Sequence, residues 1–247
     1  MGKKGYKMGV HRTLMGDAAL APALPETRWF NEENLWGLLE RYRSVILKPS
    51  GGTGGYGVIQ VTALGDGRLE VRFGPRRQVF INQKAALTRI KQGMQHRTLY
   101  LVQQRISLIE VGGCPVDIRV MVQRKKGSPW QVTGHLAKVA GQGYIVTNIA
   151  RSGGKVLPVH RAITLSSAKG ISPNRAVRDL CDTALRAAQR LGRFSPRSLI
   201  AGFDMGVDRK GKVWIIEANP KPALSLFLKL KDKSMYRRII SFPRGYG

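Results

Sequence analysis

A glycine-rich segment, 50–57 (SGGTGGYG), restricts the fold of this chain more than any other part of its sequence. Strand-like apolar patterns precede it at 44–49 and follow it at 58–64, so the unit is predicted to be strand, loop and strand. Glycine has no Cβ, and the N–H groups of such a loop can therefore approach phosphate oxygens closely. Lys48, on the strand that enters the loop, can reach the same phosphates as a point charge.

The glycine pattern matches the common phosphate-binding loops only in part. It satisfies G-x-G-x-x-G, but a Rossmann loop leads directly into a helix, and a strand pattern follows here. A P-loop has its lysine after the last glycine, whereas Lys48 precedes the first. A protein kinase has HRD and DFG motifs downstream, and neither occurs. We interpret the segment as a different phosphate flap, and a glycine-rich hairpin without a ligand is the alternative. Its candidate contact residues are Gly52, Gly54, Gly55 and Gly57.

A second candidate site lies in two predicted strands near the C-terminal end, 199–207 and 212–218. Glu217 and Asn219 are two residues apart, so their side chains leave the same face of a strand, and Asp204 can lie opposite on the paired strand. Carboxylate and amide oxygens suit Mg²⁺, which keeps its other positions for water and nucleotide phosphates. A hairpin with solvated acids is the alternative, and the apolar run before Glu217 favours a function.

The remaining patterns predict an α+β fold of two lobes that meet near Gln103 and Gln104. Helices are predicted at 31–43, 82–93 and 172–192, the last beginning with Ser172 and Pro173 and ending at Gly192, and further strands at 68–80, from 99, at 116–124 and at 130–139. The predicted parts are a lead-in segment with a short helix (1–43), an N-terminal lobe with the glycine loop (44–102), a C-terminal lobe with the metal site (103–230) and a basic tail (231–247).

The charge balance is extreme for a folded chain. The 247 residues include 42 Lys and Arg against 15 Asp and Glu, which gives a net charge of +27. Such a field attracts polyanions, so an acidic polymer or a nucleic acid is an expected partner. No apolar run approaches the roughly 18 residues of a membrane span, and no signal peptide is evident, so we expect a cytoplasmic protein. Cys114 and Cys181 lack the spacing of a zinc site or a disulfide framework.

Together these motifs resemble the ATP-grasp superfamily, and most closely its YheC/YheD family of endospore coat-associated proteins. Ligases that add glutamate to ribosomal proteins are a more distant likeness. The resemblance runs from 6–14 (YKMGVHRTL) through 24–27 (LPET) to Pro222, with six motifs in the same order. It implies an ATP-grasp fold, in which two α+β lobes clasp ATP, here without the usual full domain that precedes the fold. It also implies an association with the spore coat.

The resemblance assigns roles to individual residues. Lys7 and Lys48 correspond to the two phosphate lysines, and Asp117 and Arg119 to a D-x-R signature near the ribose and the reacting phosphate. The hinge that faces adenine corresponds to Gln103, Gln104 and Ile106, although many relatives have Glu where Gln104 stands. Lys138 takes the place of a frequent Arg. Asn148 and Arg151 fall in a loop similar to the N-x-x-x-G-G substrate loop, with Ser152 as an extra residue. The metal ligands correspond to Asp204, Glu217 and Asn219.

The implied activity is that of an ATP-dependent carboxylate–amine ligase that acts through an acyl phosphate, with ATP and Mg²⁺ as cofactors. The carboxylate and the amine are not identified by the sequence. One alternative is a non-catalytic protein that keeps the fold and coats or packages a polyanion. Another alternative is an enzyme whose substrate is itself an acidic polymer.

Overall fold

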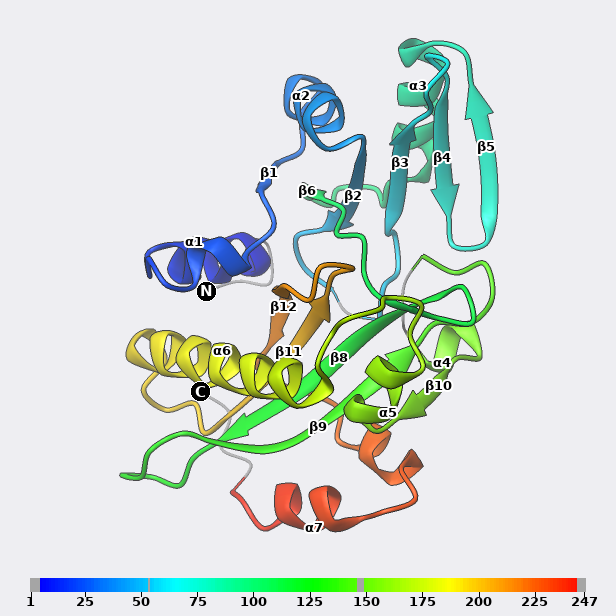
Figure 1. The fold of residues 1–247 in the computed structure, drawn as a ribbon. Helices are drawn as coiled ribbons and strands as arrows, with labels where there is room; N and C mark the ends of the chain where they lie inside the picture. Colours follow the sequence, from blue (N-terminus) through cyan, green and yellow to red (C-terminus); the bar gives the residue numbers. More distant parts are fainter. Residues whose placement is uncertain (1–4, 53, 146–148, 244–247) are drawn as a thin grey trace.

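The computed structural model describes residues 5–52, 54–145 and 149–243. It has two antiparallel sheets of six strands each, and the first sheet stands above the second in Figure 1. Helices cover one face of the first sheet and both faces of the second. The predicted α+β class is confirmed.

The first sheet has the strand order β1-β6-β2-β3-β4-β5. Its strands are β1 Thr27–Trp29, β2 Ser44–Pro49, β3 Ile59–Ala63, β4 Leu69–Phe73, β5 Arg76–Phe80 and β6 Tyr100–Gln104. Helices α2 (Glu32–Tyr42) and α3 (Gln83–Gly93) begin at Asn31 and Asn82, whose side chains accept bonds from backbone N–H groups in the first turn. These helices lie where the sequence predicted them, and they pack on the alternate apolar residues of the strands.

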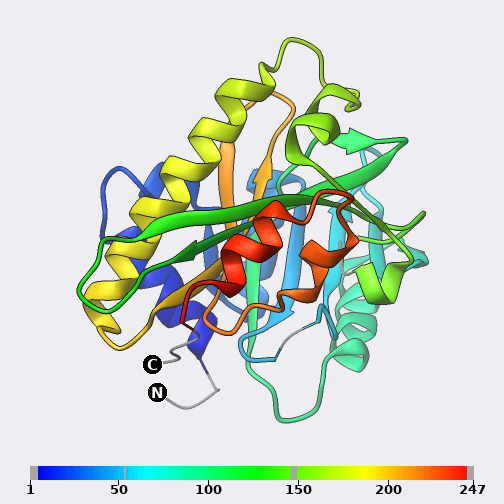
Figure 2. The ribbon, with the colours of Figure 1, turned by 90° about the horizontal axis from the view of Figure 1, so that it is seen from below.

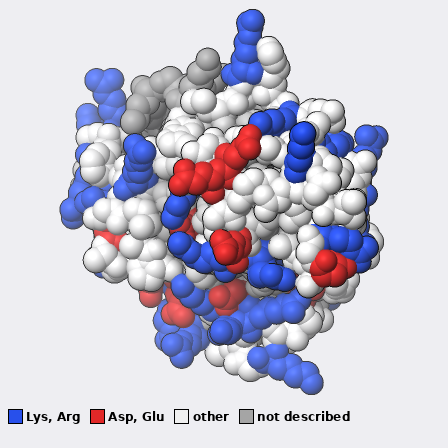
Figure 3. Space-filling model, turned by 90° about the horizontal axis from the view of Figure 1, so that it is seen from above, with Lys and Arg blue, Asp and Glu red and all other residues white. Residues whose placement is uncertain are grey.

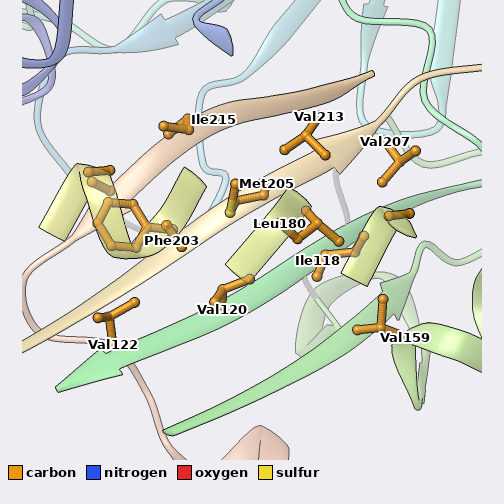
Figure 4. Close-up of a cluster of buried hydrophobic side chains, with 14 of the residues drawn as sticks. Ile118, Val120, Val122, Val159, Leu180, Phe203, Met205, Val207, Val213 and Ile215 are labelled. Atoms are coloured by element: carbon orange, nitrogen blue, oxygen red, sulfur yellow. The ribbon is translucent and has the colours of Figure 1, made fainter. Parts of the chain in front are cut away.

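The second sheet has the order β10-β9-β8-β11-β12, and β7 pairs with β8. Its strands are β7 Glu110–Val111, β8 Cys114–Gln123, β9 Gln131–Val139, β10 Lys155–Leu157, β11 Ile200–Val207 and β12 Val213–Asn219. Helices α5 (Val159–Thr164) and α6 (Pro173–Phe194) cover one face. Figure 4 shows part of the core on this face, where Ile118 of β8 lies beside Leu180 of α6, and Val120 of β8 and Phe203 of β11 belong to the same cluster.

The predicted end of the long helix at Gly192 is wrong, because α6 continues to Phe194. Gly192 lies inside the helix and is buried against Trp130. A Cβ at this position would be 2.8 Å from Trp130 Nε1, so the missing side chain lets the indole pack against the helix. This glycine therefore marks a close contact and does not mark a helix end.

The opposite face of the second sheet is partly covered by the C-terminal segment. The short helices η2 (Ser225–Lys229) and α7 (Ser234–Ile240) lie across β8 and β9 in Figure 2. Ile239 is fully buried there, and its carbonyl accepts a hydrogen bond from Gln123 Nε2 at 3.1 Å. Part of the segment predicted as a basic tail is thus a packed helix.

The N-terminal segment contains elements that the sequence analysis did not predict. Helix α1 (Tyr6–Met15) contacts α6, β1 and β12, and the short turn η1 (Ala21–Ala23) leads to β1 at the edge of the first sheet. Helix α1 therefore lies between the two sheets and touches elements of both.

Candidate functional site

The first sheet turns polar side chains toward the second sheet, on the face opposite α2 and α3. Lys48 Nζ donates to Gln103 Oε1 at 2.8 Å and to the carbonyl of Ile216 on β12 at 3.2 Å. Burial lowers the pKa of Lys48 to about 8, and the charge of Lys7 adds to this effect while Glu217 opposes it. A single buried ammonium thus joins strand β2 of one lobe to β12 of the other.

A cavity of about 30 Å³ lies beside this ammonium. Lys7, His11, Lys48, Gln103 and Glu217 contribute to its lining. Lys7 Nζ is 3.6 Å from Glu217 Oε1, and burial together with the charge of Lys48 lowers the pKa of His11 to about 4. Cationic side chains from α1 and β2 therefore meet at one space, where they could bind an anionic ligand.

A buried ionic cluster lies on the second sheet, on the face opposite α6. Arg119 holds Asp204 with two bonds, Nε to Oδ1 at 2.9 Å and Nη2 to Oδ2 at 3.0 Å. Lys138 Nζ is 2.8 Å from both Asp117 Oδ1 and Asp204 Oδ1. Strand pairing explains the proximity, since Arg119 is opposite Asp204 and Asp117 is opposite Lys138. The structure therefore brings the four predicted residues together.

The two acids of the cluster have opposite pKa shifts. Burial raises the pKa of Asp117, and Lys138 compensates only in part. Burial also acts on Asp204, but the charges and hydrogen bonds of Arg119 and Lys138 outweigh it and hold the pKa of Asp204 well below its usual range. Asp204 is therefore ionised at neutral pH.

Arg119 has one donor left over. Its Nη1 is buried and has no hydrogen-bond partner among the residues that the structure describes. A buried donor without a partner costs about 1–3 kcal/mol. An anion that reached the cluster would remove this cost, so the arrangement favours binding of a phosphate or carboxylate oxygen here.

The three predicted metal ligands lie on neighbouring strands. Asp204 is opposite Glu217, as predicted, and Gly202 is opposite Asn219. Asn219 Oδ1 accepts a bond from the N–H of Lys221 at 3.0 Å. Within the described ranges no three His, Cys, Asp or Glu residues are grouped as a metal site would be. Two carboxylates and one amide oxygen nevertheless fit Mg²⁺, because this ion takes few protein ligands and completes its shell with water and phosphate oxygens.

The glycine loop has a backbone conformation that favours glycine. Gly52, Gly54, Gly55 and Gly57 all have positive φ, between 71° and 90°, a region that residues with a Cβ rarely occupy. The loop begins beside α1, since the N–H of Lys7 donates to the carbonyl of Ser50 at 3.2 Å. The start of the flap thus lies beside α1, which carries Lys7, and directly follows β2, which carries Lys48.

The hinge residues have different surroundings. Gln103 donates to Thr27 Oγ1 at 2.7 Å and lines the small cavity. Gln104 Oε1 accepts from the N–H of Glu26 at 3.3 Å and lines a larger cavity of about 440 Å³ on the side of α1 and Trp214. Ile106 follows β6 in the link to the second lobe.

The substrate loop is described only in part. Asn148 lies outside the described residues, and the same is true of the side chain of Arg151, whose backbone belongs to α4 (Ile149–Ser152). The segment nevertheless lies close to the cluster, because β10 pairs with β9 and places Val156 opposite Lys138. Earlier in the chain, Gly143 O accepts a bond from Arg72 Nη2 of β4 at 2.7 Å, so the first lobe contacts the turn that follows β9.

Two polar residues that line the small cavity, His11 and Thr27, were not assigned to the site from the sequence. His11 is four residues after Lys7, a spacing that places both on one face of a helix. This spacing could have assigned His11 to the site, but only if α1 had first been predicted as a helix.

Comparisons with known proteins show which family this chain resembles over its length. A family model described as YheC/D like ATP-grasp matches residues 3–247. The endospore coat-associated protein YheD of Bacillus subtilis (strain 168) is 31% identical over 229 residues, which cover 90% of this chain and 49% of YheD. YheC of the same organism is 26% identical over 236 residues, which cover 92% of this chain and 62% of YheC. The chain thus spans about half the length of YheD and less than two thirds of that of YheC.

Two solved structures share the fold. The ATP-grasp ligase PsnB, in complex with a phosphomimetic variant of its minimal precursor, Mg and ADP, has a TM-score of 0.53 at 16% identity, with 96% of this chain and 57% of PsnB covered. N5-carboxyaminoimidazole ribonucleotide synthetase from Thermotoga maritima has a TM-score of 0.50 at 11% identity, with 98% of this chain and 50% of that protein covered. In the part of the chain described here, no helix is long and apolar enough to cross a membrane.

Proposed function

The chain belongs to the YheC/D-like ATP-grasp family, and from this we propose that it binds ATP with Mg²⁺ in the cleft between its sheets and uses it to join a carboxylate to an amine. The observation that carries the proposal is that each lobe has a buried cation, Lys48 or Arg119, that interacts electrostatically with the same two carboxylates, Asp204 and Glu217. Lys48 and Arg119 are each less than 10% exposed, and Arg119 keeps a buried donor that an anion would satisfy.

Each group of residues has a distinct part in binding. The glycine loop and the two lysines, Lys7 and Lys48, would hold the phosphates, and the hinge at Gln103 would face the base. Asp204, Glu217 and Asn219 would hold Mg²⁺, which when bound supplies positive charge beside the phosphate oxygens. Asp204 already accepts bonds from Arg119 and Lys138, so these cations and the metal would share one carboxylate.

The proposed reaction has two steps. A carboxylate oxygen attacks the γ-phosphorus, the bond to the β,γ-bridging oxygen breaks, and ADP leaves with that electron pair. An amine then attacks the acyl carbon, phosphate leaves, and the nitrogen loses its proton. Arg119 and Lys138 would offset negative charge on the transferred group by electrostatic positioning. None of the residues assigned to the site is required as a nucleophile.

Thermal melting tests the nucleotide site. ATP should raise the melting temperature in Mg²⁺, by several degrees at about 100 times its Kd, and much less in EDTA. Replacing Glu217 with Gln should remove most of the part that depends on the metal. Glu33→Gln, on the exposed side of α2, is the matched control and should behave like the wild type. Equal ATP-induced shifts of the melting temperature in Mg²⁺ and in EDTA would contradict the assignment of the metal ligands.

A second candidate function is attachment to a polyanion, as the net charge of +27 suggests. The observation that favours it is a basic surface on the C-terminal segment and the turn beside it. Its exposed side chains are Lys125, Lys126, Lys229, Lys231, Arg237 and Arg238. Lys125 Nζ lies 6.0 Å from the ring of Phe242, which brings the turn next to the segment. Asp232 is the only acid between Lys221 and Pro243.

None of its six side chains lines either of the two cavities, and the surface would serve attachment, whether or not ligation occurs. The face seen from above in Figure 3 has a more mixed charge, because carboxylates lie there between the Lys and Arg side chains. The relatives are named as endospore coat-associated proteins, and a basic surface that binds an acidic polymer would suit association with such a layer.

A further inference from the structure

We propose that Arg190 on α6 is a positioning residue that holds helix α1 in the orientation in which Lys7 faces the phosphates of the nucleotide. The inference rests on the proposed ATP site. It adds a residue on the far side of α1 that neither the motifs nor the cleft identify.

Arg190 binds the C-terminal end of α1. Its Nε donates to the carbonyl of Thr13 at 3.1 Å, and its Nη2 donates to the carbonyl of Gly16 at 3.2 Å. The last carbonyls of a helix have no partners within the helix, and a cation at that end is favourable for the helix dipole. Beside this contact, Arg186 Nε donates to both carboxylate oxygens of Asp17, at 3.0 and 3.1 Å.

The local structure is shaped to admit the guanidinium. A Cβ at Gly16 would lie 2.7 Å from Arg190 Nη2, so a glycine is what leaves room for the contact. The guanidinium carbon also lies 5.3 Å from the centre of the Phe194 ring, which limits its movement on the other side. Arg190 is thus held between an aromatic ring and the end of α1.

The other end of α1 meets the candidate site. Lys7 Nζ is 3.6 Å from Glu217 Oε1, and the N–H of Lys7 donates to Ser50 O at the start of the glycine loop. This end has no side-chain cap, because Gly5 occupies the N-cap position. Ten helical residues span only about 15 Å, so a tilt at the Arg190 end is transmitted to Lys7 and to the loop.

A double-mutant cycle tests this role with ATP as the probe. Arg190→Ala should weaken Mg-ATP binding about tenfold, the size typical of one charge-assisted hydrogen bond, and Lys7→Ala should do the same. In the Lys7→Ala background, Arg190→Ala should change the affinity by less than about twofold, because both act through one contact. Arg190→Lys, which can still donate to a carbonyl, should restore part of the loss. Arg193→Ala, an exposed position on the same helix, is the control.

Amide hydrogen exchange without nucleotide provides an independent test of whether Arg190 orients α1. Arg190→Ala should speed exchange in α1 and at Lys7, and leave α2 and α3 unchanged. Unchanged exchange in α1, or additive losses of affinity in the cycle, would overturn the role of Arg190. If the wild type bound no ATP, the proposed function would fail, and the exchange result would still decide whether Arg190 orients α1.

Discussion

At the scale of single residues, the cleft depends on cations that are buried before any ligand arrives. Lys48 has a pKa of about 8, since burial disfavours its charged form. The phosphates of a nucleotide would favour that form. Binding should therefore be coupled to protonation of Lys48.

The first prediction follows from this pKa. Below pH 8 Lys48 is mostly charged, and above it the free protein loses the proton that binding requires, so the Kd for Mg-ATP should rise by up to about tenfold per pH unit. Calorimetry between pH 7 and 9.5 measures it, and the heat should depend on the buffer because a proton is taken up. Lys48→Arg keeps its charge over this range and should bind with little pH dependence. A flat profile for the wild type would contradict the assignment.

The second prediction concerns Arg119, whose free donor is assigned to the transferred group. Arg119→Ala should lower the rate of phosphate release, with a suitable carboxylate and amine, by about 10² to 10³, and should weaken ATP affinity by less than about tenfold. Arg119→Lys keeps a charge but loses the bidentate contact with Asp204, so its rate of phosphate release should lie between those of the wild type and Arg119→Ala. A loss confined to affinity would leave Arg119 with a binding role only.

At the scale of elements, two glycines in helices have opposite expected effects on stability. Gly192 of α6 is packed against Trp130, whereas a Cβ at Gly37 of α2 would meet nothing within 4 Å. The same substitution therefore separates helix propensity from packing.

The third prediction uses this pair. Gly37→Ala should stabilise the protein by up to about 1 kcal/mol, because alanine favours the helix. Gly192→Ala gains the same propensity but forces Trp130 to move, which costs about 1–3 kcal/mol, so a net loss is expected. Urea unfolding midpoints for both variants provide the measurement. If Gly192→Ala were stabilised as much as Gly37→Ala, the close packing against Trp130 would not be as described.

Elements with strong local signals could be predicted from the sequence, and those that depend on tertiary contacts could not. Helix α2 has an Asn cap and regular leucines, and it lies where its pattern placed it. Helix α1 has no side-chain cap and no acidic residue in its first turn, and it is held by α6 and the first sheet. The same holds for the site: Asp204 and Glu217 were predictable as cross-strand partners, but the contact of Lys48 with Ile216 O joins residues 168 apart in sequence.

At the scale of the whole molecule, the basic surface of the C-terminal segment and the cleft are proposed to bind different ligands, so their charges can be changed independently. Neutralising four of its residues, Lys229, Lys231, Arg237 and Arg238, to Gln should weaken binding to heparin or duplex DNA and spare the ATP-dependent melting shift. Replacing Arg178, Arg193, Arg197 and Lys210, which are exposed elsewhere, removes the same charge and should have a smaller effect.

The fourth prediction is the salt dependence of this binding. If all six side chains of the surface contact phosphates, the affinity for duplex DNA should fall roughly 10³-fold between about 50 and 200 mM salt. Base preference should be slight, since only 7% of the residues are aromatic. Titrations of heparin, duplex DNA and polyglutamate with wild type and Glu217→Gln give the result. Negligible binding to all three at low salt would leave the charge as a solubility feature, and loss of binding in Glu217→Gln would contradict two separate sites.

The contacts between the lobes have a mechanical consequence. They occur at α1, at Lys48 on β2 and at Arg72 on β4, so the supports are spread across the width of the first sheet. Rotation of the first lobe about an axis through any two of these contacts must break the third. Opening of the space between the sheets therefore costs at least one of these contacts, and which one breaks sets the direction of the rotation.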